Sequence, residues 1–241
     1  MSRGGGVSHA AVSTNAARFA FPRLLSEPGM AAPISLDALD LAALLCSRLC
    51  HDVISPVGAI VNGLEVLADE KDEAMKKNAI DLIKKSAGQA SAQLQFARLA
   101  YGAAGSAGAQ IDLGDAEGVA RKLLQNDRLN IAWNLPRTLL PKNRVKLLLN
   151  LILVATATIA RGGKLIIDPV GAGEQMGFRL TAEGTNAKVP PAIPDLLAGV
   201  AKDLDAHGIQ PYYTGLLART SGLKISLASK GESVVLTAAE A

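Results

Sequence analysis

One histidine in the first quarter of the chain lies among residue types that nucleophilic chemistry uses. His51 is followed at once by Asp52 and, one helical turn later, by Ser55 and Pro56. A neutral imidazole is a nucleophile near neutral pH, an adjacent carboxylate can orient or polarise it, and a hydroxyl one turn away offers a further polar contact. This spacing indicates a histidine able to attack an electrophile. The plainer alternative is a surface histidine beside a tolerated helix kink.

A long helix has to position these side chains. At about 100° per residue the apolar series falls on one stripe, which predicts a bundle core, and His51 falls on the opposite side, facing water. Pro56 has no N–H, so the carbonyl of Asp52 loses its helical partner and we expect a bend just past the histidine. The residues of the predicted stripe are Cys46, Leu49, Val53, Val57, Ile60, Leu64 and Leu67.

The wider pattern favours chemistry over the plainer alternative. It resembles the phosphoacceptor box of two-component histidine kinases, in which an acidic residue follows the histidine and Ser, Thr or Asn stands fourth and Pro fifth after it. The flanking segments RLCHD, SPVGAI and NGLE are more specifically similar to the ChpT-type bacterial histidine phosphotransferases. That resemblance covers the first long helix.

The resemblance implies a role for each residue of the box. His51 would be the nucleophile through Nε2, Asp52 would orient or polarise Nδ1, and Ser55 would be a lesser polar contact. The Mg²⁺ for the reaction would come from the acidic pocket of an incoming receiver domain, so this chain is expected to bind no metal and no cofactor of its own. The expected partner-binding residues are Arg48, Gly58, Ala59, Asn62 and Val66.

The first part of the fold is expected to be a helical hairpin over residues 34–103. The first helix begins near Ser35 or Asp37 and ends near Ala68, and the second runs from about Glu73 to Tyr101. Two long antiparallel helices cannot bury both flanks alone, so we expect a homodimer that completes a four-helix bundle.

Residues 104–110 form a Gly- and Ala-rich linker, and residues 111–241 alternate between strand-like and helix-like patterns. Helices layered on one face of a mixed sheet would make this part an α/β sandwich, and the whole chain α+β. The strands are expected at 111–113, 130–134, 164–168, 176–182, 223–229 and 233–237, and the helices at 115–125, 142–160, 195–206 and 212–220.

The second part resembles the ATP-binding (Bergerat or GHKL) domain of histidine kinases in layout, but its nucleotide motifs are degenerate. Where the family's metal-binding helix has two asparagines four apart, this chain has Asn150 and then Val154, which offers no oxygen to Mg²⁺. The Asp-x-Gly-x-Gly loop is replaced by residues 182–186, AEGTN, and no Gly-rich lid is present in the sequence. We therefore expect that ATP does not bind.

A complete phosphoacceptor box beside a degenerate ATP domain indicates a relay protein. By family analogy the phosphoryl group passes from the receiver domain of a hybrid histidine kinase, through His51, to response regulators that control the cell cycle. Two alternatives remain at this point, namely a non-enzymatic dimeric adaptor that binds receivers and, less favoured, an ATP-dependent kinase.

Composition excludes several other classes. Hydrophobic residues make up 49% of the chain, aromatic residues 3%, and the formal charge is only +3, so a nucleic-acid surface is not indicated. The apolar run at residues 147–160 is too short to span a bilayer. Cys46 and Cys50 are expected to be reduced and core-facing. These two expectations together predict a cytoplasmic protein. Residues 1–33 suggest a flexible tail in which Met30 is a candidate translation start, and His9 and His207 have no metal-ligand spacing.

Overall fold

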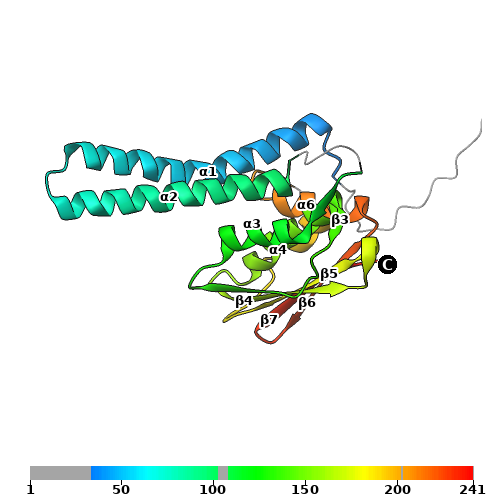
Figure 1. Ribbon diagram of the computed structural model, residues 1–241. Helices are drawn as coiled ribbons and strands as arrows, with labels where there is room; N and C mark the ends of the chain where they lie inside the picture. Colours follow the sequence, from blue (N-terminus) through cyan, green and yellow to red (C-terminus); the bar gives the residue numbers. More distant parts are fainter. Residues whose placement is uncertain (1–33, 103–107, 202, 241) are drawn as a thin grey trace, which may run out of the picture. The chain divides into compact units, whose positions relative to one another are not determined.

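The fold consists of a helical hairpin followed by an α/β part (Figure 1). The structure, a computed structural model, describes residues 34–102, 108–201 and 203–240. The tail predicted for residues 1–33 and positions 104–107 of the predicted linker lie outside the described residues.

Two long helices form the hairpin, as the sequence predicts. Helix α1 spans Ala38–Asp69, and the Asp37 carboxylate caps it by accepting the N–H groups of Leu39 and Asp40. Helix α2 spans Glu73–Ala100 and is capped in the same way by Asp72. Both caps satisfy backbone donors that a helix N-terminus leaves unpaired.

The hairpin seam is narrower than the predicted stripe. Pro56 and Gly63 are the buried residues of α1, and a Cβ on Gly63 would lie 2.7 Å from the Cγ1 atom of Ile83 on α2, so glycine lets the two helices approach closely. Four of the seven residues of the predicted stripe are partly buried, namely Leu49, Val53, Ile60 and Leu67.

The other three residues of that stripe, Cys46, Val57 and Leu64, are exposed, so the predicted core-facing stripe is wrong for the single chain. Cys46 and Cys50 are exposed rather than core-facing. The reason is that α1 carries two adjacent apolar faces and α2 covers only one of them. The large exposed side chains of the second face are Leu39, Ile54, Val57, Val61 and Leu64. Helix α1 is also long and apolar enough to cross a membrane, by length and composition only.

The α/β part contains a five-stranded mixed sheet in the order β2-β4-β5-β7-β6, in which β2 and β4 are parallel and the other neighbours antiparallel. A short antiparallel pair, β1 with β3, precedes the long α4 helix. Helices α3, α4 and α6 lie between α2 and the sheet (Figure 1). The strands are β1 Gln110–Asp112, β2 Leu129–Trp133, β3 Leu139–Pro141, β4 Gly163–Val170, β5 Gly177–Glu183, β6 Lys224–Lys230 and β7 Ser233–Ala239. The helices are α3 Leu113–Leu124, α4 Lys142–Thr158, the 3-10 turn Gly173–Gln175, α5 Ile193–Ala198 and α6 Ile209–Thr220.

The α+β class and most element positions agree with the sequence predictions, and the structure corrects two of them. The strand β3 was not predicted. The helix expected at 195–206 is the short α5, which ends where Gly199 takes a left-handed conformation (φ 77°) and its N–H bonds back to the Leu196 carbonyl. Residues 203–208 therefore form a loop, and this loop reaches the hairpin.

Candidate functional site

His51 lies in the middle of α1 with 60% of its side chain exposed. Its Nδ1 atom is 3.6 Å from the Asp52 Oδ1 atom. That distance is too long for a good hydrogen bond but short enough for the carboxylate to stabilise a positive charge that develops on the ring. Asp52 thus faces the Nδ1 side of the ring and leaves the Nε2 side to approach an electrophile.

Arg48 holds the Asp52 carboxylate in place. Its Nε atom donates to both carboxylate oxygens, at 3.0 and 2.9 Å, from one turn earlier on α1. The sequence predicts that Arg48 binds a partner, whereas the structure shows its guanidinium bonded to Asp52 within the site. This pair fixes Asp52 and offsets part of its charge.

A second histidine, which the sequence analysis set aside, completes the site. His207 comes from the loop before α6, and its ring meets the His51 ring edge-on, with centroids 4.9 Å apart and planes at 68°. Arg48 Nη1 also approaches the His207 carbonyl oxygen at 3.5 Å, across 159 residues of sequence. No local spacing could have predicted this neighbour, because it depends on how the two parts of the chain pack.

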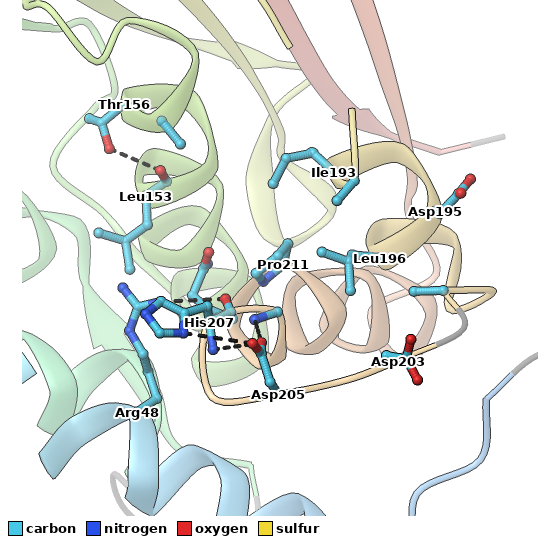
Figure 2. Close-up of a pocket in the computed structure, with 15 residues that line it drawn as sticks. Arg48, Leu153, Thr156, Ile193, Asp195, Leu196, Asp203, Asp205, His207 and Pro211 are labelled. Carbon is cyan, nitrogen blue, oxygen red and sulfur yellow. Dashed lines mark hydrogen bonds and ion pairs between the residues drawn. The ribbon is translucent and has the colours of Figure 1, made fainter. Parts of the chain in front are cut away.

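Asp205 shapes the loop that carries His207 (Figure 2). Its carboxylate accepts the N–H groups of His207 at 2.9 Å and Gly208 at 2.7 Å. These two bonds, that from Gly208 foremost, hold the pKa of Asp205 below its usual value. Its second oxygen is 3.7 Å from the Nδ1 atom of His207, so each imidazole of the pair has a carboxylate beside Nδ1.

The remaining predicted residues are arranged along α1. Ser55 and Asn62 are exposed, Gly58 and Ala59 are partly buried, and Val66 is exposed on the distal turns. A Cβ added at Gly58 would meet nothing within 4 Å, so the surface just beyond His51 is open and built from small residues. Such a surface allows close approach by another protein.

A cleft of about 800 Å³ opens beside Arg48, between α4, α5 and the start of α6 (Figure 2). Leu153, Ile193, Leu196 and Pro211 give it apolar walls. Its charged lining consists of Arg48, Asp195, Asp203, Asp205 and the titratable His207. Since Arg48 already pairs with Asp52, the carboxylates dominate, and the lining is unfavourable for a polyphosphate.

Asn150, the residue at the predicted position of a metal-binding asparagine, is buried in a structural network. Its Nδ2 donates to the Ala100 carbonyl at 3.1 Å and the Lys146 carbonyl at 2.9 Å, and its Oδ1 accepts from Gln210 Nε2 at 3.1 Å. Val154 is buried as well. Asn150 therefore joins the end of α2 to α4 and α6, and its amide is committed there.

Lys146 strengthens the same junction by donating to the Tyr101 carbonyl at 3.4 Å. Burial lowers the pKa of Lys146 and raises the pKa of the Tyr101 hydroxyl. Burial is the largest cause of both shifts, as packing at a hairpin–domain junction produces, and the charges of Arg48 and Asp52 also act on the Tyr101 hydroxyl. Within the described ranges, no three His, Cys, Asp or Glu side chains gather in a way that could hold a metal ion.

Comparison with known proteins identifies close relatives. A family model described as the histidine phosphotransferase C-terminal domain matches residues 113–233. The protein phosphotransferase ChpT of Brucella abortus (strain 2308) is 50% identical over 211 residues, which cover 87% of this chain and all of that protein. A solved structure of a bacterial phosphotransferase is 48% identical and superposes with a TM-score of 0.79, covering 86% of this chain and 98% of that one. A histidine kinase of Acinetobacter baumannii, AdeS, is 16% identical with a TM-score of 0.43, covering 78% of this chain and 95% of that one.

Proposed function

Since this chain belongs to the ChpT-type family of bacterial histidine phosphotransferases, we propose that His51 is the residue through which it passes phosphoryl groups. The chain is a protein phosphotransferase of a phosphorelay, as the family assignment shows. The observation that carries the choice of residue is the exposed imidazole of His51 with a carboxylate held beside its Nδ1 atom.

The transfer needs little beyond positioning and charge stabilisation. The lone pair of His51 Nε2 attacks the phosphorus of an aspartyl phosphate on a receiver domain. The new N–P bond forms as the P–O bond to the aspartate breaks, and the receiver's carboxylate leaves with the electron pair. A second receiver's aspartate reverses these steps and frees the histidine.

Asp52 assists because the imidazole becomes positively charged as the N–P bond forms. Its carboxylate, 3.6 Å from Nδ1, stabilises that charge, and Arg48 keeps the carboxylate in position. Ser55 lies one turn further on the exposed surface and serves as a lesser polar contact for the phosphoryl group.

Receiver domains are the proposed partners, both as donors from hybrid histidine kinases and as acceptors in response regulators. The open surface at Gly58, Ala59, Asn62 and Val66 is the proposed docking floor beyond His51. In this scheme the receiver contributes Mg²⁺ through its own acidic pocket, and this chain contributes no metal ligand.

We propose that the protein works without ATP. Asn150 is buried and hydrogen-bonded to Ala100, Lys146 and Gln210, so its amide is not directed at a nucleotide. Asp195, Asp203 and Asp205 around the nearby cleft would repel a triphosphate. Both observations support a domain that has kept the architecture of an ATPase for a structural purpose.

A homodimer is the proposed assembly. The second apolar face of α1 includes Ile54, 69% exposed, and Leu64, 52% exposed, on a helix that α2 covers from one side. Burying such a face removes apolar area from water at about 25 cal/mol per Å². Pairing of two hairpins into a four-helix bundle would cover it. Such pairing also explains why α1 is long and apolar without membrane insertion. We therefore propose a cytoplasmic location.

Radiolabel transfer tests the proposed function. A receiver domain charged with radiolabelled acetyl phosphate should label the wild-type chain and fail to label His51→Ala, whose far-ultraviolet circular dichroism should be unchanged. Incubation with radiolabelled ATP alone should leave both proteins unlabelled. Labelling of His51→Ala by the receiver would refute the role of His51, and binding of receivers by the wild type without any labelling would instead indicate an adaptor.

A further inference from the structure

A ring from the second part of the chain touches the proposed phosphoacceptor. The imidazoles of His51 and His207 meet edge to face, with centroids 4.9 Å apart and planes inclined at 68°. Aromatic pairs favour this geometry at this separation because the positive edge of one ring faces the negative face of the other. The contact joins a residue in the middle of α1 to the loop preceding α6.

The loop that carries His207 is held rigidly from its own side. Asp205 Oδ1 accepts the backbone N–H groups of His207 and Gly208, and the Asp205 carbonyl accepts the N–H of Ile209 at 3.0 Å, which starts α6. The loop is therefore a turn held by hydrogen bonds at the helix entrance, and the position of the His207 backbone follows from the position of α6.

The fold also fixes α6 against the hairpin at three points. Gln210 bonds to Asn150, which in turn bonds to the end of α2. The Tyr212 hydroxyl donates to the Ile34 carbonyl, just before α1, at 3.1 Å. Arg48 reaches the His207 carbonyl from α1 itself. These bonds place His207, which lies in the loop before α6, beside His51 on α1.

His51 needs such a neighbour because little else restrains it. Its side chain is 60% exposed, and its Nδ1 atom lies 3.6 Å from Asp52, too far for a hydrogen bond that would fix the ring plane. An exposed side chain that exchanges rotamers presents its nucleophilic nitrogen to the electrophile for only part of the time. A ring edge against it limits those rotamers.

We propose that His207 is a positioning residue for phosphotransfer, holding the His51 imidazole by ring contact so that Nε2 meets the incoming phosphoryl group in line. This inference rests on the proposed function of His51. Under this proposal the degenerate domain takes part in the reaction, because it supplies the His207 ring that orients His51.

Two substitutions of His207 separate the ring contact from the effect of the imidazole nitrogens. Asp205 faces His207, Asp52 faces His51, and Arg48 lies between the two elements. His207→Phe keeps an aromatic ring and removes the titratable nitrogens, whereas His207→Ala removes both. Asp81→Asn, at an exposed position on α2, is the control.

Single-turnover transfer from a receiver domain charged with acetyl phosphate measures the effect in the full-length chain. We expect His207→Ala to lower the maximal rate about three- to tenfold, the size of one edge-to-face ring contact, with an unchanged half-saturating receiver concentration. His207→Phe should recover the rate to within about twofold. The unfolding temperature should hardly change, since the His207 side chain is 71% exposed.

Each other result overturns the proposal. An unchanged maximal rate in His207→Ala would refute the positioning role. Equal slowing of His207→Ala and His207→Phe would assign the effect to the imidazole nitrogens. A change only in the half-saturating receiver concentration would assign the effect to docking. The ¹H–¹⁵N imidazole spectrum of the unphosphorylated protein tests the contact without any donor, because His207→Ala should shift the His51 ring signals and Asp81→Asn should not. A wild type that takes no label at His51 would instead refute the proposed function, and this inference with it.

Discussion

Replacing Asp52 by Asn tests the electrostatic part of the proposed reaction. The change keeps the size of the side chain and removes the charge that lies 3.6 Å from His51 Nδ1. At that distance two opposite unit charges attract by about 1 kcal/mol in a water-like dielectric and by about 4–5 kcal/mol at an effective dielectric constant of about 20.

The lower end of that range applies here. His51 is 60% exposed, and Arg48 offsets part of the carboxylate's charge. We therefore expect a loss of about 1–2 kcal/mol of transition-state stabilisation, which slows phosphotransfer about 5- to 30-fold. Stability should change by less than about 1 kcal/mol, because the Arg48–Asp52 pair is only partly buried.

Single-turnover transfer from a charged receiver domain, together with urea unfolding, separates the two effects. Asp81→Asn removes a carboxylate from an exposed position on α2 and serves as the control, with an unchanged rate expected. If Asp52→Asn transfers as fast as the wild type, or loses several kcal/mol of stability, the assignment of Asp52 to stabilising the imidazolium is refuted.

Three further predictions concern the hairpin and its junction. Gly58→Ala should raise the free energy of unfolding by about 0.5–1 kcal/mol, since nothing lies near an added Cβ. Gly63→Ala should lower that free energy by about 1–2 kcal/mol, because the added Cβ would contact Ile83. Urea unfolding of the two variants checks both, and equal effects would contradict the packing of the hairpin. Ile54→Glu places a charge on the exposed apolar face and should turn a dimer into a monomer in light scattering, whereas a wild type that is already monomeric would refute the assembly. Asn150→Ala should cost about 2–3 kcal/mol in thermal unfolding by leaving buried partners unpaired, and a smaller loss would show that the network matters little.

The hairpin could be predicted almost to its ends because its signals are local. The first helix begins next to Asp37, one of the two predicted starts, and the second begins at Glu73 as predicted, capped by Asp72. The charged turn at residues 70–72 and the apolar periodicity on either side of it leave few other ways to divide this segment into helices. The same reasoning failed for Cys46 and Cys50, because a helical wheel gives the width of an apolar surface but not which part of it a neighbouring helix covers.

Half of the candidate site was accessible from the sequence. His51 and Asp52 are neighbours, so their proximity follows from the chain itself. His207 and Asp205 reach the site only through tertiary packing of α6, and a histidine without metal-ligand spacing carries no local signal of that placement. Likewise, the sequence shows that Val154 offers no oxygen to Mg²⁺ where the kinase family has a second asparagine, but the burial of Asn150 in a junction between α2, α4 and α6 becomes visible only in three dimensions.

The most direct test of the central claim is to locate the phosphoryl group. After labelling by a charged receiver domain, the protein is digested at alkaline pH, where the N–P bond survives, and its peptides are sequenced by electron-transfer mass spectrometry. The account predicts one acid-labile phosphoryl group, on His51. A phosphoryl group on Ser55 or His207, with His51 unmodified, would contradict it.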